Sequence, residues 1–479
     1  MDYSTVYLAV LVLLGLSILT IELCRYWQVS DAVTEAQFLF RGKKASHAFT
    51  SNVGSMFSAT YFFGAVIVFS KLLGAWMVLV IILVCAISSA LYRRLLKLLD
   101  SELGQEILEK QDDNPLMKLL QQRLGPEKVR SLAGLYVVIY FALLIEELAV
   151  SRALLNSIFP SRPVVASGLL LIVCIIMLVY LYAGGFRAVL VSDFVQTVVL
   201  LAFIVTLIYF SLTRNSTVGS SITSTALSPT LVAGNILATS LLGVSWFVSG
   251  IDFTSRLNFD SQPDIPLITQ RIRVVKMSFF ALALTLLAGA LFGHSTHEAL
   301  SPHTLPPQYL ETLAALFLGD SLRIVKVVFF VSIFCMIFTT LDTLLLAMLQ
   351  SSYYTRPKLA RRSGTQAIIA LAAAASILVP PKALYVFGIV AASMTTLPML
   401  IVLGVLYPVF KSTTEVKLHY IWAAFATTWL LYLAFGGLLV EEFEVQFLIP
   451  CVPFLLALLF MIAQHQPWRG MKGGPTWKK

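Results

Sequence analysis

The chain has 479 residues, of which 58% are hydrophobic and only 12% are charged, and its mean hydropathy is +0.85. A soluble domain cannot bury that much apolar surface, so the composition excludes a soluble globular protein. The formal net charge of +9 would suit a nucleic-acid partner, but the distribution of the basic residues argues against one.

Apolar runs recur from one end of the chain to the other. Each is about 20 residues long, enough to cross the hydrocarbon core of a bilayer as a helix. Because backbone amides in lipid need internal hydrogen-bond partners, we predict an all-α integral membrane protein embedded in the lipid bilayer. The thirteen predicted spans are 3–24, 48–70, 72–98, 131–158, 164–184, 187–213, 230–256, 272–294, 322–353, 365–380, 384–410, 417–438 and 446–464.

The basic residues indicate how these spans are oriented. With the N-terminus outside, most of the 34 Lys and Arg residues fall in inner loops, among them Arg93, Arg94 and Lys97. Arg187 and Arg256, at the inner ends of spans, belong to the same group. Positive charge on the inner side is typical of membrane proteins. We therefore predict a multi-pass protein of the bacterial inner cell membrane, with a cytoplasmic C-terminus and no nucleic-acid partner.

Two spans are interrupted by small and polar residues. The second carries SNVGSMFSATYFFG at 51–64, and the seventh carries GVSWFVSGIDFTSR at 243–256. They stand five spans apart and cross in opposite directions, as the broken helices of a five-plus-five inverted repeat would. Alternatively, the small residues only permit close helix packing. We predict a first span with its inner loop at 1–47, repeats at 48–213 and 214–410, and two extra helices with a tail at 411–479.

Charged side chains are costly inside a membrane, so those within predicted spans are candidates for an ion site. Asp193 lies in the sixth span, and Asp342 lies in the ninth beside Thr339, Thr340 and Thr343. The residues at 339, 342 and 343 share one helix face, and their oxygens suit a hard cation. Two simpler interpretations remain: the threonines could bond their own i−4 carbonyls, and Asp193 could meet interfacial water at a helix end.

Three segments resemble the sodium/solute symporter family. YLYAGGFRAVLVSDFVQ at 180–196 looks like its signature, a Gly-Gly-x-x-Ala-Val-x-x-Thr/Ser-Asp-x-x-Gln run. FTTLDT at 338–343 and FSATYFFG at 57–64 are similar to two further family segments, and the resemblance covers essentially the whole chain. It implies a LeuT-type inverted-repeat fold and Na⁺ as the coupling ion.

The resemblance also implies ligands. The principal sodium site would use the hydroxyls of Thr339 and Thr340 and the backbone carbonyls of Gly54, Phe57 and Met336. Asp193, Asp342 and Thr343 would form a second cation site or the sodium exit path. Asp342 departs from the family, whose members with that second site usually carry Ser there. The extra carboxylate could strengthen sodium binding or carry a proton.

The predicted substrate cavity lies between the two broken helices. Its predicted lining residues are Ser58, Thr60 and Tyr61 of the second span, Glu146 of the fourth, and Trp246 and Phe247 of the seventh. By the resemblance, Glu146 lies near the polar head of some relatives' substrates. A carboxylate there would suit an amine or a quaternary ammonium, although it could also serve structure only.

The chain carries no nucleotide-binding loop, HExxH motif or nucleophile elbow, so we do not expect an enzyme. His294, His297 and His303 are interpreted as part of a solvated loop and not as a transition-metal site. The sequence favours a secondary active transporter that couples Na⁺ to symport of a small polar organic solute by alternating access. The alternatives are a proton-coupled carrier that uses Asp342 and a transporter-like membrane sensor.

Overall fold

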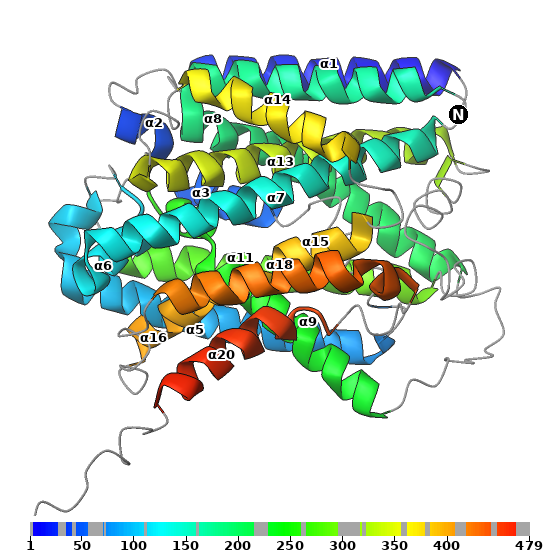
Figure 1. The fold of residues 1–479 in the computed structure, drawn as a ribbon. Coiled ribbons are helices and arrows are strands. Elements are labelled where there is room, and N and C mark those ends of the chain that lie inside the picture. The colour runs from blue at the N-terminus through cyan, green and yellow to red at the C-terminus, as the bar shows by residue number, and fades with distance from the viewer. Residues whose placement is uncertain are drawn as a thin grey trace, which may run out of the picture.

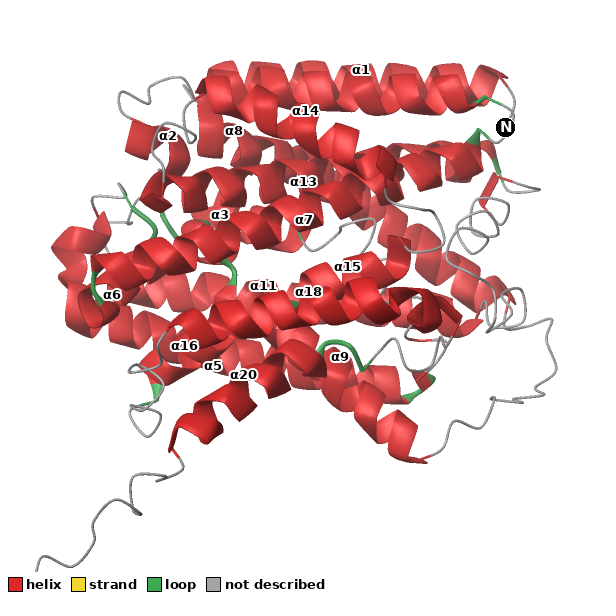
Figure 2. Ribbon diagram, in the orientation of Figure 1, coloured by secondary structure: helices red, strands yellow, loops and turns green. Residues whose placement is uncertain are grey.

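The computed structural model describes residues 3–26, 35–40, 45–55, 70, 73–109, 113–159, 162–214, 229–259, 265–295, 317–318, 322–355, 362–378, 384–407, 418–441 and 448–465. Within these ranges the regular structure is helical, without strands (Figure 2). Nine of the described helical segments are long and apolar enough to cross a membrane, and three shorter apolar helices accompany them. The predicted all-α membrane architecture is confirmed.

The helices are α1 (Tyr3–Tyr26), α2 (Glu35–Phe40), α3 (Ala45–Gly54), α5 (Trp76–Glu109), α6 (Pro115–Leu124), α7 (Pro126–Ile158), α8 (Pro163–Arg214), α9 (Pro229–Ser249), α10 (Ile251–Ser255), α11 (Leu267–Ser295), α13 (Arg323–Thr355), α14 (Arg362–Leu378), α15 (Leu384–Ser393), α16 (Thr396–Leu406), α18 (Leu418–Glu441) and α20 (Cys451–His465). Each predicted span coincides with at least part of one of them.

Two predicted spans are joined in α8, which bends sharply at Gly185. This residue has a φ of 55°, a left-handed conformation that glycine adopts without steric cost. A Cβ added there would lie 2.3 Å from the carbonyl oxygen of Phe38, so the bend also brings α2 against the backbone of α8. The second glycine of the signature run is therefore required by the turn between the fifth and sixth predicted spans.

The eleventh predicted span is broken into α15 and α16, an interruption that the sequence analysis did not predict. Met394 and Thr395 form the turn, and Pro398 lies in the first turn of α16. Proline lacks an N–H and its ring clashes with the preceding helical turn, which explains why α15 cannot continue through it. The Ser249 hydroxyl donates to the Thr395 carbonyl over 3.1 Å, which ties this turn to the end of α9.

Helix α13 lies in the middle of the bundle, packed against α7 and α8, while α1 lies on one outer side and α18 with α20 on another (Figure 1). Nearly every side chain of α13 between Val327 and Ser352 is buried. Because α13 carries the Thr–Asp cluster, its central position buries those oxygens inside the bundle.

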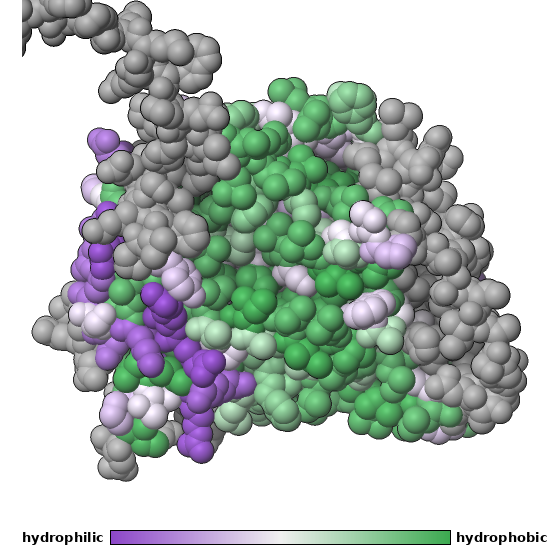
Figure 3. Space-filling view, turned by 90° about the horizontal axis from the view of Figure 1, so that it is seen from below, coloured by the Kyte–Doolittle hydropathy of each residue, from purple (hydrophilic) through white to green (hydrophobic). Residues whose placement is uncertain are grey.

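The outer surface is largely apolar. Leu11 on α1, Leu212 on α8 and Ile324 on α13 are each more than 60% exposed. Figure 3 shows hydrophobic side chains across the middle of one face, with hydrophilic residues gathered toward one edge. Such a surface would be unstable in water and suits contact with lipid chains.

Candidate functional site

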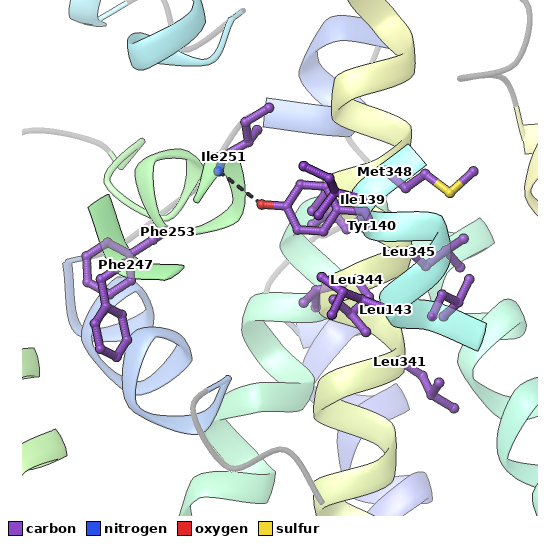
Figure 4. Packing of buried hydrophobic residues seen from close by; sticks show 14 of the residues in the cluster. Ile139, Tyr140, Leu143, Phe247, Ile251, Phe253, Leu341, Leu344, Leu345 and Met348 are labelled. Carbon is purple, nitrogen blue, oxygen red and sulfur yellow. Dashed lines mark hydrogen bonds between the residues drawn. The ribbon is translucent and has the colours of Figure 1, made fainter. Parts of the chain in front are cut away.

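The seventh predicted span is broken at Gly250, between the end of α9 and the start of α10. A side chain has no room there, because a Cβ would lie 2.8 Å from the Oδ1 atom of Asp252. The break is bonded to α7, because the Tyr140 hydroxyl accepts from the Ile251 amide at 3.2 Å (Figure 4). The same hydroxyl donates to Asp252 Oδ1 at 3.0 Å. Tyr136 donates to the Ser249 carbonyl. The backbone groups freed by the break are thus satisfied by tyrosines of α7.

Arg256, predicted to lie at the inner end of a span, is within the polar interior of the bundle and not at its surface. Its side chain is only 1% exposed. The guanidinium donates from Nε to Ser51 Oγ at 2.7 Å, from Nη1 to Asp252 Oδ2 at 3.1 Å and from Nη2 to Thr343 Oγ1 at 2.7 Å. One side chain therefore joins α10 to α3 and α13, because a buried charge needs such partners.

Asp193 is completely buried, which excludes the interpretation that it meets interfacial water. Its Oδ2 atom accepts a hydrogen bond from the Ser51 hydroxyl and lies 3.9 Å from the Nη2 atom of Arg256. Its Oδ1 atom has no hydrogen-bond partner in the described part of the chain. An unsatisfied buried carboxylate oxygen is costly, so this atom is a candidate ligand for a cation.

Asp342 is also fully buried and belongs to a chain of side-chain hydrogen bonds. Its Oδ2 atom accepts from the Ser192 hydroxyl at 3.1 Å, and Ser192 in turn accepts from the Gln196 amide at 3.3 Å. The carbonyl oxygen of that same amide accepts from the Thr339 hydroxyl. Two residues of α8 thus connect two of the predicted ion-site residues on α13.

The Thr340 hydroxyl donates to the Met336 carbonyl, four residues earlier, at 2.8 Å. This is the simpler arrangement that the sequence left open for these threonines. The bond uses the hydrogen of the hydroxyl and leaves oxygen lone pairs on Thr340 for a cation. Gly54 lies against α8, where a Cβ would be 2.9 Å from Thr197 Oγ1. Phe57, the remaining predicted ligand, lies outside the described residues.

These groups fit the sodium ion that the family resemblance implies. The hydroxyls of Thr339 and Thr340, the carbonyl of Met336 and the unpartnered Oδ1 of Asp193 all offer oxygen, the donor that hard cations prefer. Their roles as ligands stay predictions.

The structure describes only some of the predicted substrate residues. Ser58, Thr60 and Tyr61 lie outside the described part of the chain. Trp246 is half-buried and packs against the hydrophobic core.

Phe247 is fully buried in an aromatic cluster. Its ring lies 5.3 Å from that of Phe279 and 6.2 Å from that of Phe253, and its carbonyl accepts from the Tyr92 hydroxyl at 2.8 Å. Figure 4 shows Phe247 and Phe253 on the side of the break away from Tyr140. These contacts give Phe247 a packing role, and a substrate role for it stays a prediction.

Glu146 is 4% exposed, and its carboxyl group lies against the backbone of α15. A Cβ added at Gly388 would lie 2.5 Å from Glu146 Oε1, so the glycine is what allows the carboxylate to approach. Helix α15 also contacts α9. The carboxylate therefore lies on the side of α7 that faces the broken helix α15–α16, an element absent from the predicted cavity.

A second polar cluster lies at the C-terminal end of α10. Asn114, at the N-cap of α6, donates through Nδ2 to the Ile251 carbonyl at 2.9 Å and to Ser255 Oγ at 2.7 Å. Ser255 donates to Gln350 Oε1 of α13 at 2.8 Å. These buried contacts hold α6, α10 and α13 together.

Several members of the polar interior were not identified from the sequence: Ser51, Ser192, Gln196, Asp252 and Arg256. Asp252 and Arg256 stand four residues apart within one predicted span, a spacing at which helical side chains meet. The sequence therefore offered a signal for this ion pair. Ser192 and Gln196 stand in the signature run at 180–196 but were given no role there, and their contacts with α13 depend on helix packing.

No protein-family model matches the chain, and no curated protein matches it. Its structure is similar to that of a Na⁺-coupled sialic acid symporter in a substrate-bound, outward-open state, with a TM-score of 0.60 and 12% identity over 94% of this chain and 97% of that one. A nucleobase-cation-symport-1 family transporter in a closed conformation, with bromovinylhydantoin bound, aligns with a TM-score of 0.46 and 14% identity over 89% of this chain and 95% of that one. The likeness to the first structure shows that this chain has the predicted LeuT-type transporter fold.

Proposed function

We propose that this protein is a sodium-coupled secondary transporter that moves a small polar organic solute across the cell membrane by alternating access. The observation that carries the proposal is the buried set of polar side chains around Arg256 and Asp342. It links α3, α8, α10 and α13 beside a broken helix. Buried polar networks in membrane helices are costly and mark ion or substrate pathways.

The proposed sodium ion binds between α3, α8 and α13. Thr339 and Thr340 supply hydroxyls, Met336, Gly54 and Phe57 supply carbonyls, and the neighbouring Asp193 supplies negative charge. All of these ligands are oxygen atoms, which sodium prefers to softer ligands. Thr340 and Met336 are already oriented toward each other by their hydrogen bond, so binding requires little rearrangement there.

The contacts at the end of α10 form the proposed inner gate. Asn114, Ser255 and Gln350 tie α6, α10 and α13 together through buried hydrogen bonds. With the N-terminus outside, this end faces the cytoplasm. Opening toward the inside would require these bonds to break, so sodium and solute leave only after this cluster separates.

The proposed solute site lies where α7, α9 and α15 meet, at the level of the helix breaks. Glu146 offers a buried carboxylate beside the small residue Gly388, and Trp246 offers an aromatic surface. Ser58, Thr60 and Tyr61 would add polar contacts from the second span. A carboxylate and an aromatic ring that line one cavity would suit a solute with an amine or quaternary ammonium group.

The test first measures the uptake of radiolabelled solutes by proteoliposomes, with and without a sodium gradient. Uptake of the best-transported solute is then measured for the Thr340→Ala variant. Thr428→Ala is the matched control, because Thr428 is buried in α18 and donates to its own i−4 carbonyl over the same 2.8 Å. Thr340→Ala should raise the half-saturating sodium concentration by about tenfold, the loss of a contact worth roughly 1.4 kcal/mol, while Thr428→Ala leaves it unchanged. Equal sodium dependence in all three proteins would overturn this sodium site.

A further inference from the structure

We infer that the guanidinium of Arg256 fills the second cation position of this protein, so that a single sodium ion binds in each transport cycle. The inference rests on the proposed function and defines its ion stoichiometry. It starts from the three residues that the family resemblance assigns to a second site, namely Asp193, Asp342 and Thr343. In this chain a side-chain cation already lies among them.

The guanidinium uses the oxygens that a second sodium ion would need. Thr343 Oγ1 accepts from Arg256 Nη2 at 2.7 Å and donates toward Asp342 Oδ1 at 3.5 Å, so its hydrogen and one lone pair are in use. Asp193 Oδ2 lies 3.9 Å from the same nitrogen and accepts from Ser51. A second sodium ion at these atoms would face a positive charge at short range in a buried, low-dielectric setting.

The guanidinium is also fixed in place. Each of its three nitrogens donates to a different residue: Ser51 on α3, Asp252 on α10 and Thr343 on α13. Arginine stays protonated in proteins, so it cannot vacate the position by losing its charge. Moving it would leave Asp252 without its ion pair in the interior, which buried carboxylates tolerate poorly.

One negatively charged oxygen remains for a mobile cation. Asp193 Oδ1 has no hydrogen-bond partner in the described residues, while Oδ2 is used by Ser51. Asp193 also lies beside Gly54, since a Cβ added at the glycine would be 3.7 Å from Asp193 Cβ. The free oxygen therefore belongs to the residue that borders the principal site. One fixed cation and one sodium ion then share the two oxygens of this carboxylate.

The experiment counts bound radioactive sodium on the purified, full-length protein as a function of sodium concentration. Wild type should saturate at one ion per chain with a Hill coefficient of about one. Arg256→Gln should bind two ions per chain, because the substitution removes the fixed charge and frees Thr343. Arg256→Lys retains a cation and should bind one ion. Millimolar guanidinium added to Arg256→Gln should displace the second ion only.

Arg271→Gln is the matched control, because Arg271 is equally buried but donates to the Leu257 carbonyl, and it should still bind one ion. A count of two in wild type would overturn the inference while leaving sodium coupling intact, even if Arg256→Gln did not fold. A count of one in a folded Arg256→Gln protein would also overturn it. No sodium bound by wild type would refute the proposed coupling and this inference together.

Discussion

The two predicted cation positions differ in what satisfies their oxygens. At the principal position, the Thr340 hydroxyl donates to the carbonyl of Met336 in its own helix and has no second partner among the described residues, which keeps oxygen lone pairs available. At the second position, Thr343 and the carboxylate of Asp193 face the guanidinium of Arg256, which comes from a different helix. Both positions draw hydroxyl oxygens from neighbouring turns of α13, and the second position also lies against a guanidinium.

The comparison shows that two threonines on neighbouring turns of α13 use their hydroxyl groups differently. A hydroxyl that donates a hydrogen bond to the i−4 carbonyl has a local partner, and its oxygen can still coordinate a cation. A hydroxyl that accepts a hydrogen bond from a fixed guanidinium has a cationic partner that cannot diffuse away. The ligand residues alone therefore do not reveal which position binds sodium.

The largest expected effect is on stability, from removing the arginine itself. Arg256→Ala would leave the buried Asp252 and the neighbouring Asp193 without their cation, which should cost about 3–5 kcal/mol. Adding Asp252→Asn removes one of the stranded charges, so the double variant should be less destabilised than the sum of the singles by roughly 0.5–3 kcal/mol. Unfolding in detergent, followed by tryptophan fluorescence, measures both. Strictly additive losses would show that the pair is not coupled.

Asp342→Asn should weaken sodium binding at the principal position without changing the ion count. The substitution weakens a charged hydrogen bond from Ser192, worth about 1.5–3 kcal/mol, and Ser192 is linked through Gln196 to Thr339. We expect the half-saturating sodium concentration to rise about tenfold, a change of roughly 1.4 kcal/mol, in the same binding assay. Uptake driven by a pH gradient in sodium-free buffer, and lost in this variant, would instead identify Asp342 as a proton carrier.

Gly54→Ala should damage the principal position by steric means. The new methyl group would lie 2.9 Å from Thr197 Oγ1, so α3 must move away from α8. Such overpacking costs about 1–3 kcal/mol, and it should raise the sodium concentration needed for half-saturation. Gly15→Ala on α1 is the control, because nothing lies within 4 Å of its added methyl group. Identical sodium titrations for the two variants would argue that Gly54 does not border the ion.

Tyr140→Phe should have the smallest effect on sodium binding, and it tests the surroundings of Arg256. The change removes a hydrogen bond to Asp252 and one from the Ile251 amide, and it should lower stability by about 1–2 kcal/mol. The sodium count should stay at one, since the guanidinium keeps its three partners. Tyr209→Phe, at a largely exposed position on α8, should leave the unfolding temperature unchanged. A second sodium ion bound by Tyr140→Phe would mean that Asp252 alone does not hold Arg256 in place.

Particular elements show which structural features could be predicted from local sequence patterns. The break at Gly250 and the turn at Gly185 were predictable, because small residues interrupting an apolar run and a Gly-Gly pair are local features. The break between α15 and α16 was missed, although Pro398 marks it, because proline is tolerated in membrane helices and need not interrupt them. Phe247 was predicted to face substrate, but whether an aromatic residue beside a break faces inward or packs on α5 and α11 depends on the neighbouring helices.

The sequence by itself determined the all-helical membrane architecture, the positions of the spans and the oxygen-rich cluster on α13, because hydropathy and helical periodicity act over short stretches of chain. Only the tertiary structure decided that Arg256 turns inward to Ser51, Asp252 and Thr343 and does not join the charges at the membrane surface. The reason is physical. An arginine near the end of a span can reach either water or buried partners, and two of the partners that Arg256 donates to, Ser51 on α3 and Thr343 on α13, are far from it in sequence and 2.7 Å away in space.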